Sequence, residues 1–354
     1  MRPVDATNIF NLDDFVRESV KGLKPYSSAR DEYVSDGTSM IFLDANENPY
    51  ENGVNRYPDP QQRSLKKVLG EQKGISERNI LLGNGSDEVL DLLFRAFCEP
   101  GKDNIITLPP TYGMYKVLSG INAVENREVL LTKEFEPDVD GVLKKVDKHS
   151  KLIFLCSPNN PTGNSFSREK IKALLAQFNG LVVIDEAYID FSAEESWISR
   201  LTDFPNLIVT QTLSKAYGMA GIRLGICYAS EEIIEILNKI KPPYNVNELT
   251  QQKALKRVVD VGAISREVQS ILDERGELIK ALEKVGFVQK IYPTDANFVL
   301  VKVDDAENRY NQLLKLGIVV RNRSSQPLCH NTLRFTVGTS EENKKLIATL
   351  KAMN

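Results

Sequence analysis

The stretch NLIVTQTLSKAYGMAGIRLG, residues 206–225, joins an apolar, β-branched run to a polar segment that carries two cations. The run NLIVTQ is typical of a buried strand. Lys215 follows it almost directly, small residues and glycines come next, and Arg223 stands eight residues after Lys215. Most lysines are solvated, but this pattern places one at the mouth of a buried strand. The role of such a lysine depends on which residues lie around the end of that strand.

Between about residues 79 and 228, short apolar strands alternate with helical segments. This alternation predicts an α/β fold in which a large domain has a mostly parallel sheet covered by helices on both faces. A long helical stretch at about 247–285 leads into a compact tail of strands and helices, which predicts a smaller α+β domain. We expect an N-terminal arm with part of the small domain at 1–45, a large domain at 46–245 and a small domain at 246–354.

Composition excludes several classes of protein. The net charge of −3 gives no reason to expect a nucleic-acid partner. No apolar run approaches the roughly 20 residues of a membrane span, and the first residues lack the apolar core of a secretory signal. We therefore expect a cytoplasmic protein with no membrane partner. The four scattered cysteines argue against a disulfide framework, and the two histidines leave little for a Ser-His-Asp triad or a metal site.

Polar clusters follow the predicted strands, and in parallel sheets the ligand crevice lies beyond the carboxyl ends of the strands. The clusters are GNGSDE (83–88), SPNNPTG (157–163), DEAY (185–188) and SKAYGMAGIR (214–223). GNGSDE fits a phosphate site at a helix start, or a tight turn with Ser86 as an ordinary cap. Asp185 fits a structural salt bridge, a helix cap or the partner of a cationic ligand group. Lys215, near another cation, would lose its proton more easily and form an imine with a carbonyl.

Together these parts match what a pyridoxal phosphate site needs: a phosphate cradle, an imine-forming lysine and an aspartate for the ring nitrogen. Further segments agree, namely LDANENPY (43–50), RYPDPQ (56–61), PPTYGMY (109–115), VIDEAYIDF (183–191) and LRFTVGT (333–339). The chain therefore resembles the fold-type I pyridoxal-phosphate aminotransferases of class I/II over nearly its whole length. More narrowly, it resembles the histidinol-phosphate aminotransferase branch of that family.

The resemblance implies a role for each matching residue. Lys215 is expected to hold the cofactor as an imine and to move the proton, while Asp185 keeps the ring nitrogen protonated. Tyr188 joins them as a catalytic residue that, with Asn160, hydrogen-bonds the phenolic oxygen. Tyr112 is expected to stack on the ring. The phosphate is expected to lie against Gly85, Ser86, Asp87, Ser214 and Arg223, with Tyr57 reaching the cofactor of the neighbouring subunit in a homodimer.

The resemblance also implies a substrate pocket. Arg334 is expected to grip the anionic end of the substrate, with Arg321, Tyr26 and Asn46 as further substrate-binding residues. Arg323 shares a face with Arg321 if the strand continues, and for Arg323 a solvated surface cation and a substrate ligand are equally open interpretations. Two positions depart from the family's commonest pattern, because Asp44 stands where asparagine is frequent and Asn84 where arginine is common.

The activity implied is a ping-pong transamination in L-histidine biosynthesis, in which glutamate aminates the cofactor and imidazole-acetol phosphate becomes L-histidinol phosphate. An aromatic amino-acid aminotransferase and a threonine-phosphate decarboxylase remain alternatives on the same scaffold. A regulatory module that only binds pyridoxal phosphate is the alternative from another class, although no helix-turn-helix segment or basic extension is evident. The sequence leaves the preferred substrate open.

Overall fold

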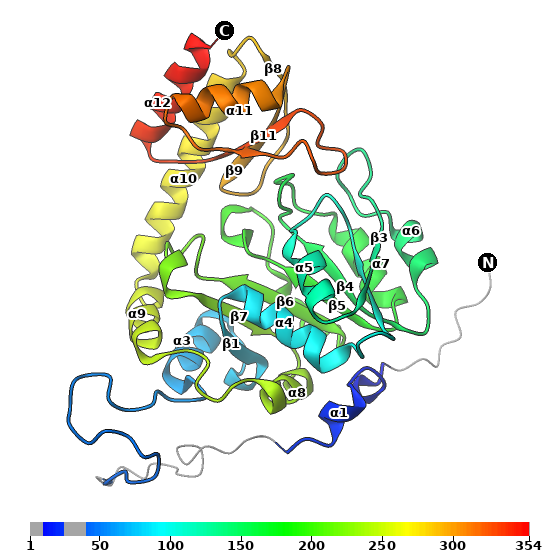
Figure 1. The fold of residues 1–354 in the computed structure, drawn as a ribbon, viewed down its shortest axis with the longest axis vertical. Helices are drawn as coiled ribbons and strands as arrows, with labels where there is room; N and C mark the ends of the chain where they lie inside the picture. Colours follow the sequence, from blue (N-terminus) through cyan, green and yellow to red (C-terminus); the bar gives the residue numbers. More distant parts are fainter. Residues whose placement is uncertain (1–9, 25–39, 354) are drawn as a thin grey trace.

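A large α/β body, a smaller sheet domain and a projecting arm make up the chain (Figure 1). The computed structural model describes residues 10–24 and 40–353. The arm, drawn in blue, leaves the body of the large domain near α3 (Arg63–Lys73). The small domain stands at the opposite end of the molecule and includes the long helix α10 (Val261–Leu282).

The large domain is built on a seven-stranded sheet with the order β1-β7-β6-β5-β4-β2-β3. All neighbouring strands pair in parallel except β7, which is antiparallel to β1 and to β6. The prediction of a mostly parallel sheet is therefore confirmed. The strands are β1 (Ile80–Asn84), β2 (Asn104–Thr107), β3 (Glu125–Glu128), β4 (Ser150–Cys156), β5 (Leu181–Asp185), β6 (Leu207–Thr212) and β7 (Leu224–Tyr228).

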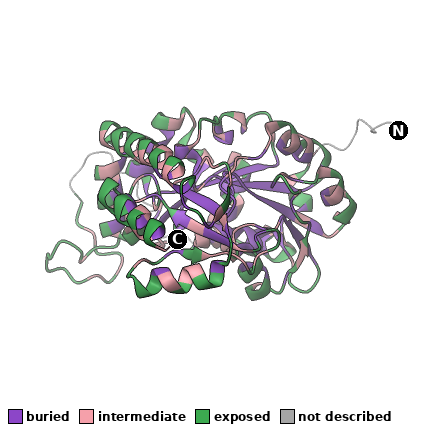
Figure 2. Cartoon of the chain, turned by 90° about the horizontal axis from the view of Figure 1, so that it is seen from above, coloured by how far each residue is buried: buried purple, intermediate pink, exposed green. Residues whose placement is uncertain are grey.

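Helices cover both faces of this sheet because the central strands are apolar on both sides. In β5, Val182 and Ile184 join one hydrophobic cluster, whereas Leu181 and Val183 join the cluster on the other face. The first cluster lies against α3 (Arg63–Lys73), α6 (Val139–Lys145), α7 (Arg168–Gln177) and α9 (Glu248–Val258). The second lies against α4 (Ser86–Phe97), α5 (Met114–Ile121) and α8 (Glu231–Ile240). Figure 2 shows the buried strands in purple between helices whose outer faces are green.

The small domain has an antiparallel four-stranded sheet in the order β10-β11-β9-β8. Its hydrophobic core includes Leu278 and Leu282 of one helix and Val299, Val301 and Leu333 of the sheet. Its elements are α10 (Val261–Leu282), β8 (Val288–Ile291), β9 (Phe298–Val303), α11 (Ala306–Lys315), β10 (Arg321–Asn322), β11 (Thr332–Thr336) and α12 (Ser340–Ala352).

The helical stretch expected at 247–285 is two helices, not one. Helix α9 ends at Val258, and α10 begins after Asp260, whose side chain accepts a hydrogen bond from the Ala263 N–H at 3.0 Å. An aspartate in that position caps a new helix start. Within the described part of the N-terminal region the single α-helix is α1 (Glu18–Lys21). Short 3-10 helices occupy Leu12–Asp14, Glu77–Asn79, Ile189–Phe191, Trp197–Arg200 and Ala220–Ile222.

A small apolar cluster joins the two domains beside the carboxyl ends of the large-domain strands. Tyr188, Phe191 and Ala216 of the large domain pack with Ala296 and Phe298 of the small domain. The Tyr188 and Phe298 rings meet edge to face with centroids 5.1 Å apart. This contact holds the small-domain sheet over the strand ends where the polar segments lie.

Candidate active site

The polar segments predicted from the sequence meet at the carboxyl ends of β4, β5 and β6. Cys156 of β4 is opposite Asp185 of β5, and Asp185 is opposite Thr210 of β6, so the segments that follow start from neighbouring points. A cavity of about 140 Å³ opens there. Its lining includes the predicted residues Ser86, Asp87, Tyr112, Asn160, Asp185, Tyr188, Ser214, Lys215 and Arg223.

Lys215 projects from the turn after β6, and part of its side chain stays exposed to solvent. Burial lowers the pKa of its ammonium group, and the charges of Arg334 and Arg223 lower it further, while the charge of Asp185 works in the opposite direction. The Nζ atom lies 5.7 Å from the centroid of the Tyr188 ring. The surroundings of Lys215 thus favour a neutral amine, which is the nucleophilic and basic form.

Asp185 ends β5 with a carboxylate that is 3% exposed. One oxygen accepts a hydrogen bond from the Tyr115 hydroxyl at 2.7 Å, and the other accepts one from the Ala187 N–H at 3.2 Å. Burial raises the pKa of Asp185, and the Tyr115 hydroxyl partly offsets that rise. Within residues 10–24 and 40–353 no cation forms an ion pair with this carboxylate, so the salt-bridge interpretation of Asp185 is wrong. A buried carboxylate of this kind calls for a cationic ligand group.

The start of α4 provides a candidate phosphate cradle. Gly85 stands at the helix start with φ of +79°, and no side chain of the described residues caps it. A Cβ atom on Gly85 would lie 2.5 Å from Arg223 Nη2, so glycine lets the guanidinium reach the helix start. Arg223 is half exposed, and its nearest carboxylate oxygen, on Asp87, is 3.8 Å away. Helix N–H groups with an adjacent cation are suited to a phosphate.

Gly225 fits the same cradle for a different reason. It pairs with Gly83 of β1 and with Thr212 of β6 in the antiparallel ladders of β7. A Cβ atom there would lie 2.3 Å from the Ser86 backbone nitrogen, which has no room to move. The sequence motif thus needs glycine at residue 225 because β7 passes directly beneath the start of α4.

The small domain brings Arg334 to Asn160, one of the residues that line the cavity. Its guanidinium donates a hydrogen bond to the Asn160 side-chain oxygen and lies over the Phe298 ring at 4.9 Å. Burial lowers the pKa of Arg334 to about 10, and the charge of Arg323 contributes to that decrease. Because the Asn160 oxygen is occupied by Arg334, its amide N–H groups are the part of this side chain available to a ligand acceptor.

Arg321 and Arg323 flank Arg334 on the neighbouring strand. Arg321 is exposed and stands directly opposite Arg334 in the β10–β11 pair. Arg323 is half-buried, and burial together with the charge of Arg321 lowers its pKa. Arg323 lies one residue beyond β10, so the common face expected for Arg321 and Arg323 stays a prediction. Of the two, Arg323 is the more deeply buried, although the resemblance implies the substrate role for Arg321.

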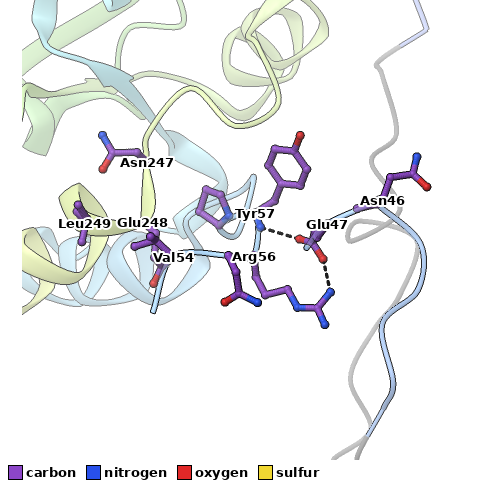
Figure 3. A pocket seen from close by; sticks show the side chains of 11 residues that line it. Asn46, Glu47, Val54, Arg56, Tyr57, Asn247, Glu248 and Leu249 are labelled. Carbon is purple, nitrogen blue, oxygen red and sulfur yellow. Dashed lines mark hydrogen bonds and ion pairs between the residues drawn. The ribbon is translucent and has the colours of Figure 1, made fainter. Parts of the chain in front are cut away.

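Two predicted residues lie away from this cavity in the same subunit. Tyr57 is 50% exposed and stacks on Tyr244 at 4.5 Å between ring centroids. Asn46 is exposed and adopts φ of +55°. Both line a separate, open pocket of about 430 Å³ formed by the arm and the start of α9 (Figure 3). Tyr26, the remaining substrate candidate, lies outside the described residues.

A carboxylate clamp shapes the arm around Tyr57. Glu47 accepts a hydrogen bond from the Tyr57 N–H and pairs with the Arg56 guanidinium, each at 2.7 Å (Figure 3). The carboxylate of Glu47 is 3% exposed, so it closes the loop between residues 47 and 57 from inside. The segments LDANENPY and RYPDPQ, far from Lys215 in this subunit, therefore form one structural unit.

Two residues of the site were missed by sequence reasoning. Tyr115 is fully buried in α5, and its ring stacks on Phe154 at 4.9 Å while its hydroxyl reaches Asp185. Cys156 lines the cavity, and burial raises the pKa of its thiol. Helix spacing gives no signal for Tyr115, because Tyr112 precedes Met114, the first residue of α5.

The residues present fit pyridoxal phosphate on three independent grounds. The buried Asp185 carboxylate, with no ion pair in the described part of the chain, suits a protonated ring nitrogen. The uncapped helix start beside Arg223 suits a phosphate. Lys215, which burial and two arginines shift toward the neutral amine, suits an aldehyde.

Comparison with known proteins agrees with this chemistry. The aminotransferase class I and II family model matches residues 42–350, and the chain belongs to this family. Histidinol-phosphate aminotransferase of Flavobacterium johnsoniae is 66% identical over 348 residues, covering 98% of this chain and 100% of that protein.

Two solved structures extend the likeness to the fold. Histidinol-phosphate aminotransferase from Clostridium acetobutylicum superposes with a TM-score of 0.79 at 26% identity, covering 85% of this chain and 91% of that one. The enzyme from Sinorhizobium meliloti, solved with pyridoxal 5'-phosphate, gives 0.77 at 25% identity and covers 84% and 82%.

These findings confirm the predicted fold class and the predicted class of enzyme, a pyridoxal-phosphate-dependent aminotransferase. The part of the chain that the structure describes contains no helix both long and apolar enough to span a bilayer. The roles of single residues stay predictions and are taken up below.

Proposed function

We propose that this aminotransferase exchanges the amino group between L-histidinol phosphate and 2-oxoglutarate, giving imidazole-acetol phosphate and glutamate, as a step of L-histidine biosynthesis. The observation that supports this most strongly is that the charge of Arg334 acts on the Lys215 amine, while the Arg334 guanidinium bonds to Asn160, which lines the same cavity as Lys215. Relatives that bear the name histidinol-phosphate aminotransferase share up to 66% of their residues with this chain over nearly its full length.

When bound, pyridoxal phosphate supplies an electron sink for the charge that develops on the substrate carbon. Asp185 would hold the proton on the ring nitrogen, which strengthens that sink. Its position at the end of β5, fixed by Tyr115 and Ala187, leaves the carboxylate little freedom to turn away. Tyr188 and the amide N–H of Asn160 would donate to the phenolic oxygen.

Lys215 would act as the base at the reacting carbon. Its amine would take the proton from the carbon that bears the amino group and pass it on within the same half-reaction. In the other half, the protonated amine would donate a proton to the corresponding carbon of the second substrate. Burial and the charges of Arg334 and Arg223 lower the pKa of the Lys215 amine, which favours the neutral form that a base requires. The Tyr188 and Phe298 contact between the domains helps to exclude water from this point.

Arg334 would hold the anionic end of both substrates. Its planar guanidinium can meet a carboxylate or a phosphate with paired hydrogen bonds. Its hydrogen bond to Asn160 ties the substrate site of the small domain to the cofactor site of the large domain. One pocket can therefore serve glutamate and L-histidinol phosphate in turn.

The protein is further proposed to act as a cytoplasmic homodimer in which Tyr57 reaches the cofactor phosphate of the neighbouring subunit. The clamp formed by Glu47 and Arg56 holds Tyr57 on an arm that projects from the body (Figure 1). Exposed apolar side chains on the same arm, Ile41 and Leu43, are suited to contact with a second copy. The domain limits of 45 and 245 predicted from the sequence are kept as proposals.

The test is a comparison of half-reactions. The pyridoxal form is mixed with L-histidinol phosphate, L-histidinol, L-phenylalanine or threonine phosphate, and the absorbance change to the pyridoxamine form is followed. L-Histidinol phosphate should react by far the best. Faster reaction of phenylalanine would favour an aromatic aminotransferase, release of carbon dioxide from threonine phosphate would favour a decarboxylase, and no reaction with any amine would favour a passive binder.

A further inference from the structure

We propose that Arg323 is a specificity-determining residue, which completes a cluster of three arginines and makes the site prefer a phosphate monoester over a carboxylate. The arginine cluster comprises Arg321, Arg323 and Arg334. The proposal rests on the proposed function, because it explains how one pocket distinguishes L-histidinol phosphate from glutamate.

The backbone fixes Arg323 beside Arg334. Its N–H donates to the Thr332 carbonyl at 2.9 Å, which extends the β10–β11 ladder by one residue. Its own carbonyl accepts from the Gln326 N–H at 2.9 Å, where the chain turns. Side chains two residues apart on a strand share a face, so Arg323 points to the same side as Arg321 and its partner Arg334.

The three guanidinium groups are charged neighbours without a counter-ion in the part of the chain that the structure describes. Burial and the charge of Arg323 lower the pKa of Arg334, and burial and the charge of Arg321 lower the pKa of Arg323. The Nε atoms of Arg323 and Arg334 are both buried without a hydrogen-bond partner among the described residues. Gathering like charges and burying their donors is unfavourable unless a ligand supplies negative charge and acceptors.

The arginine cluster borders the reaction site. The charge of Arg334 acts on Lys215, and the charges of Arg334 and Arg323 both act on the Tyr188 hydroxyl. Residues that follow Arg323, namely Ser325, Gln326 and Pro327, line a cleft with Tyr112 of the large domain. Arg323 thus lies where the two domains face each other around the substrate.

The charge of the ligand determines how much a third arginine strengthens its binding. A carboxylate carries one negative charge and two oxygens, which a single guanidinium can satisfy. A phosphate monoester carries close to two charges above its second pKa of about 6 and presents three acceptor oxygens. Removing Arg323 should therefore weaken the binding of the phosphate substrate far more than the binding of glutamate.

The experiment uses holoenzymes of the natural chain, Arg323→Gln, Arg323→Lys and the control Lys315→Gln, which removes an exposed cation from the same domain. Single-turnover kcat/KM is measured for L-histidinol phosphate and for L-glutamate. Inorganic phosphate, which has no amine to react, is titrated as an inhibitor of the glutamate half-reaction. Circular dichroism verifies folding of each variant.

Arg323→Gln should lower kcat/KM for L-histidinol phosphate about 10- to 100-fold, the size expected for one charge-assisted hydrogen bond. The value for glutamate should change less than about threefold, and phosphate should inhibit about tenfold more weakly, because one guanidinium suffices for a carboxylate. Arg323→Lys should lie between, since it keeps the charge but not the planar fork. Lys315→Gln should behave like the natural chain.

Two results would overturn the proposal. An equal decrease in kcat/KM for both substrates would mean that Arg323 supports the contact between the domains. An unchanged kcat/KM for both substrates, in a variant that folds, would mean that Arg323 is a surface cation. If the natural enzyme itself fails to prefer L-histidinol phosphate, the proposed function fails. Phosphate inhibition then still decides whether Arg323 belongs to an anion site.

Discussion

Replacing Asp185 by asparagine separates the chemistry of the site from the stability of the fold. The substitution keeps the shape of the side chain and removes its charge. The Asn oxygen can still accept the Ala187 N–H, and its amide can donate to the Tyr115 oxygen, because a hydroxyl both donates and accepts. What is lost is the anion that would face the ring nitrogen of the cofactor.

The size of the effect follows from the burial of Asp185. Losing one partner of a buried, hydrogen-bonded ion pair costs about 3–5 kcal/mol. At about 1.36 kcal/mol for each factor of ten, kcat/KM should fall about 10²- to 10⁴-fold. In the protein without cofactor the sign reverses, because Asp185→Asn removes a buried carboxylate whose pKa burial has raised. That form should be as stable as the natural chain, or more stable.

Glu186, the next residue, provides the matched control. It is also fully buried, but its oxygens accept from the Trp197 N–H, the Ser196 hydroxyl and the Gln211 amide. Glu186→Gln should leave kcat/KM of the folded enzyme within about threefold and lower the free energy of unfolding by about 1–3 kcal/mol, because donors lose an acceptor.

Steady-state transamination gives kcat/KM, and urea unfolding of the cofactor-free proteins gives stability. The reasoning is refuted if Asp185→Asn keeps kcat/KM within tenfold of the natural enzyme. It is also refuted if that variant loses stability as Glu186→Gln does, since Asp185 would then be structural.

Three further predictions address the surroundings of Asp185 and Lys215. Tyr115→Phe removes the hydroxyl that supports Asp185 and should lower kcat/KM about 10- to 100-fold; an unchanged rate in the same assay would make Tyr115 a packing residue only. Gly225→Ala would place a methyl group 2.3 Å from the Ser86 nitrogen. Equilibrium dialysis should show about tenfold weaker cofactor binding, and urea unfolding should show a free energy of unfolding about 1–3 kcal/mol lower. Unchanged cofactor binding would contradict the phosphate cradle. Arg334→Gln removes the charge that, after burial, does most to lower the pKa of Lys215, so that pKa should rise. Capture of the cofactor by Lys215, fixed with borohydride, needs the neutral amine, and its pH midpoint should therefore move to higher pH. An unchanged midpoint would exclude this coupling.

The sequence was sufficient to bring the cavity together because its motifs end parallel strands. Asp185, Asn160 and Lys215 are far apart in the chain, yet β4, β5 and β6 are neighbours and their carboxyl ends share one edge. Alternation of strands and helices predicted that sheet, and the crevice rule predicted where its ligand lies. These inferences need strand order only, and no side-chain detail.

Other parts depend on tertiary packing that a single sequence does not carry. Tyr115 lies in an apolar helix and reads as an ordinary core aromatic until β5 brings Asp185 to its hydroxyl. The sequence does not decide the role of Arg323, because its position depends on whether the β10–β11 ladder continues past Asn322, and β10 is only two residues long. Tyr57 and Asn46 lie on the arm, so their proposed partners belong to a second copy.

The unpaired charges of the site suggest why its ligands should stabilise the protein. In the described part of the chain the buried carboxylate of Asp185 has no ion-pair partner, and the arginine cluster has no counter-ion. The folded protein thus holds one carboxylate and several guanidinium groups without partners of opposite charge. A cofactor with a protonated ring nitrogen and a phosphate, followed by an anionic substrate, would satisfy both sets at once. Binding of these ligands would raise the free energy of unfolding, since a ligand that binds only the folded state adds RT ln(1 + [L]/Kd).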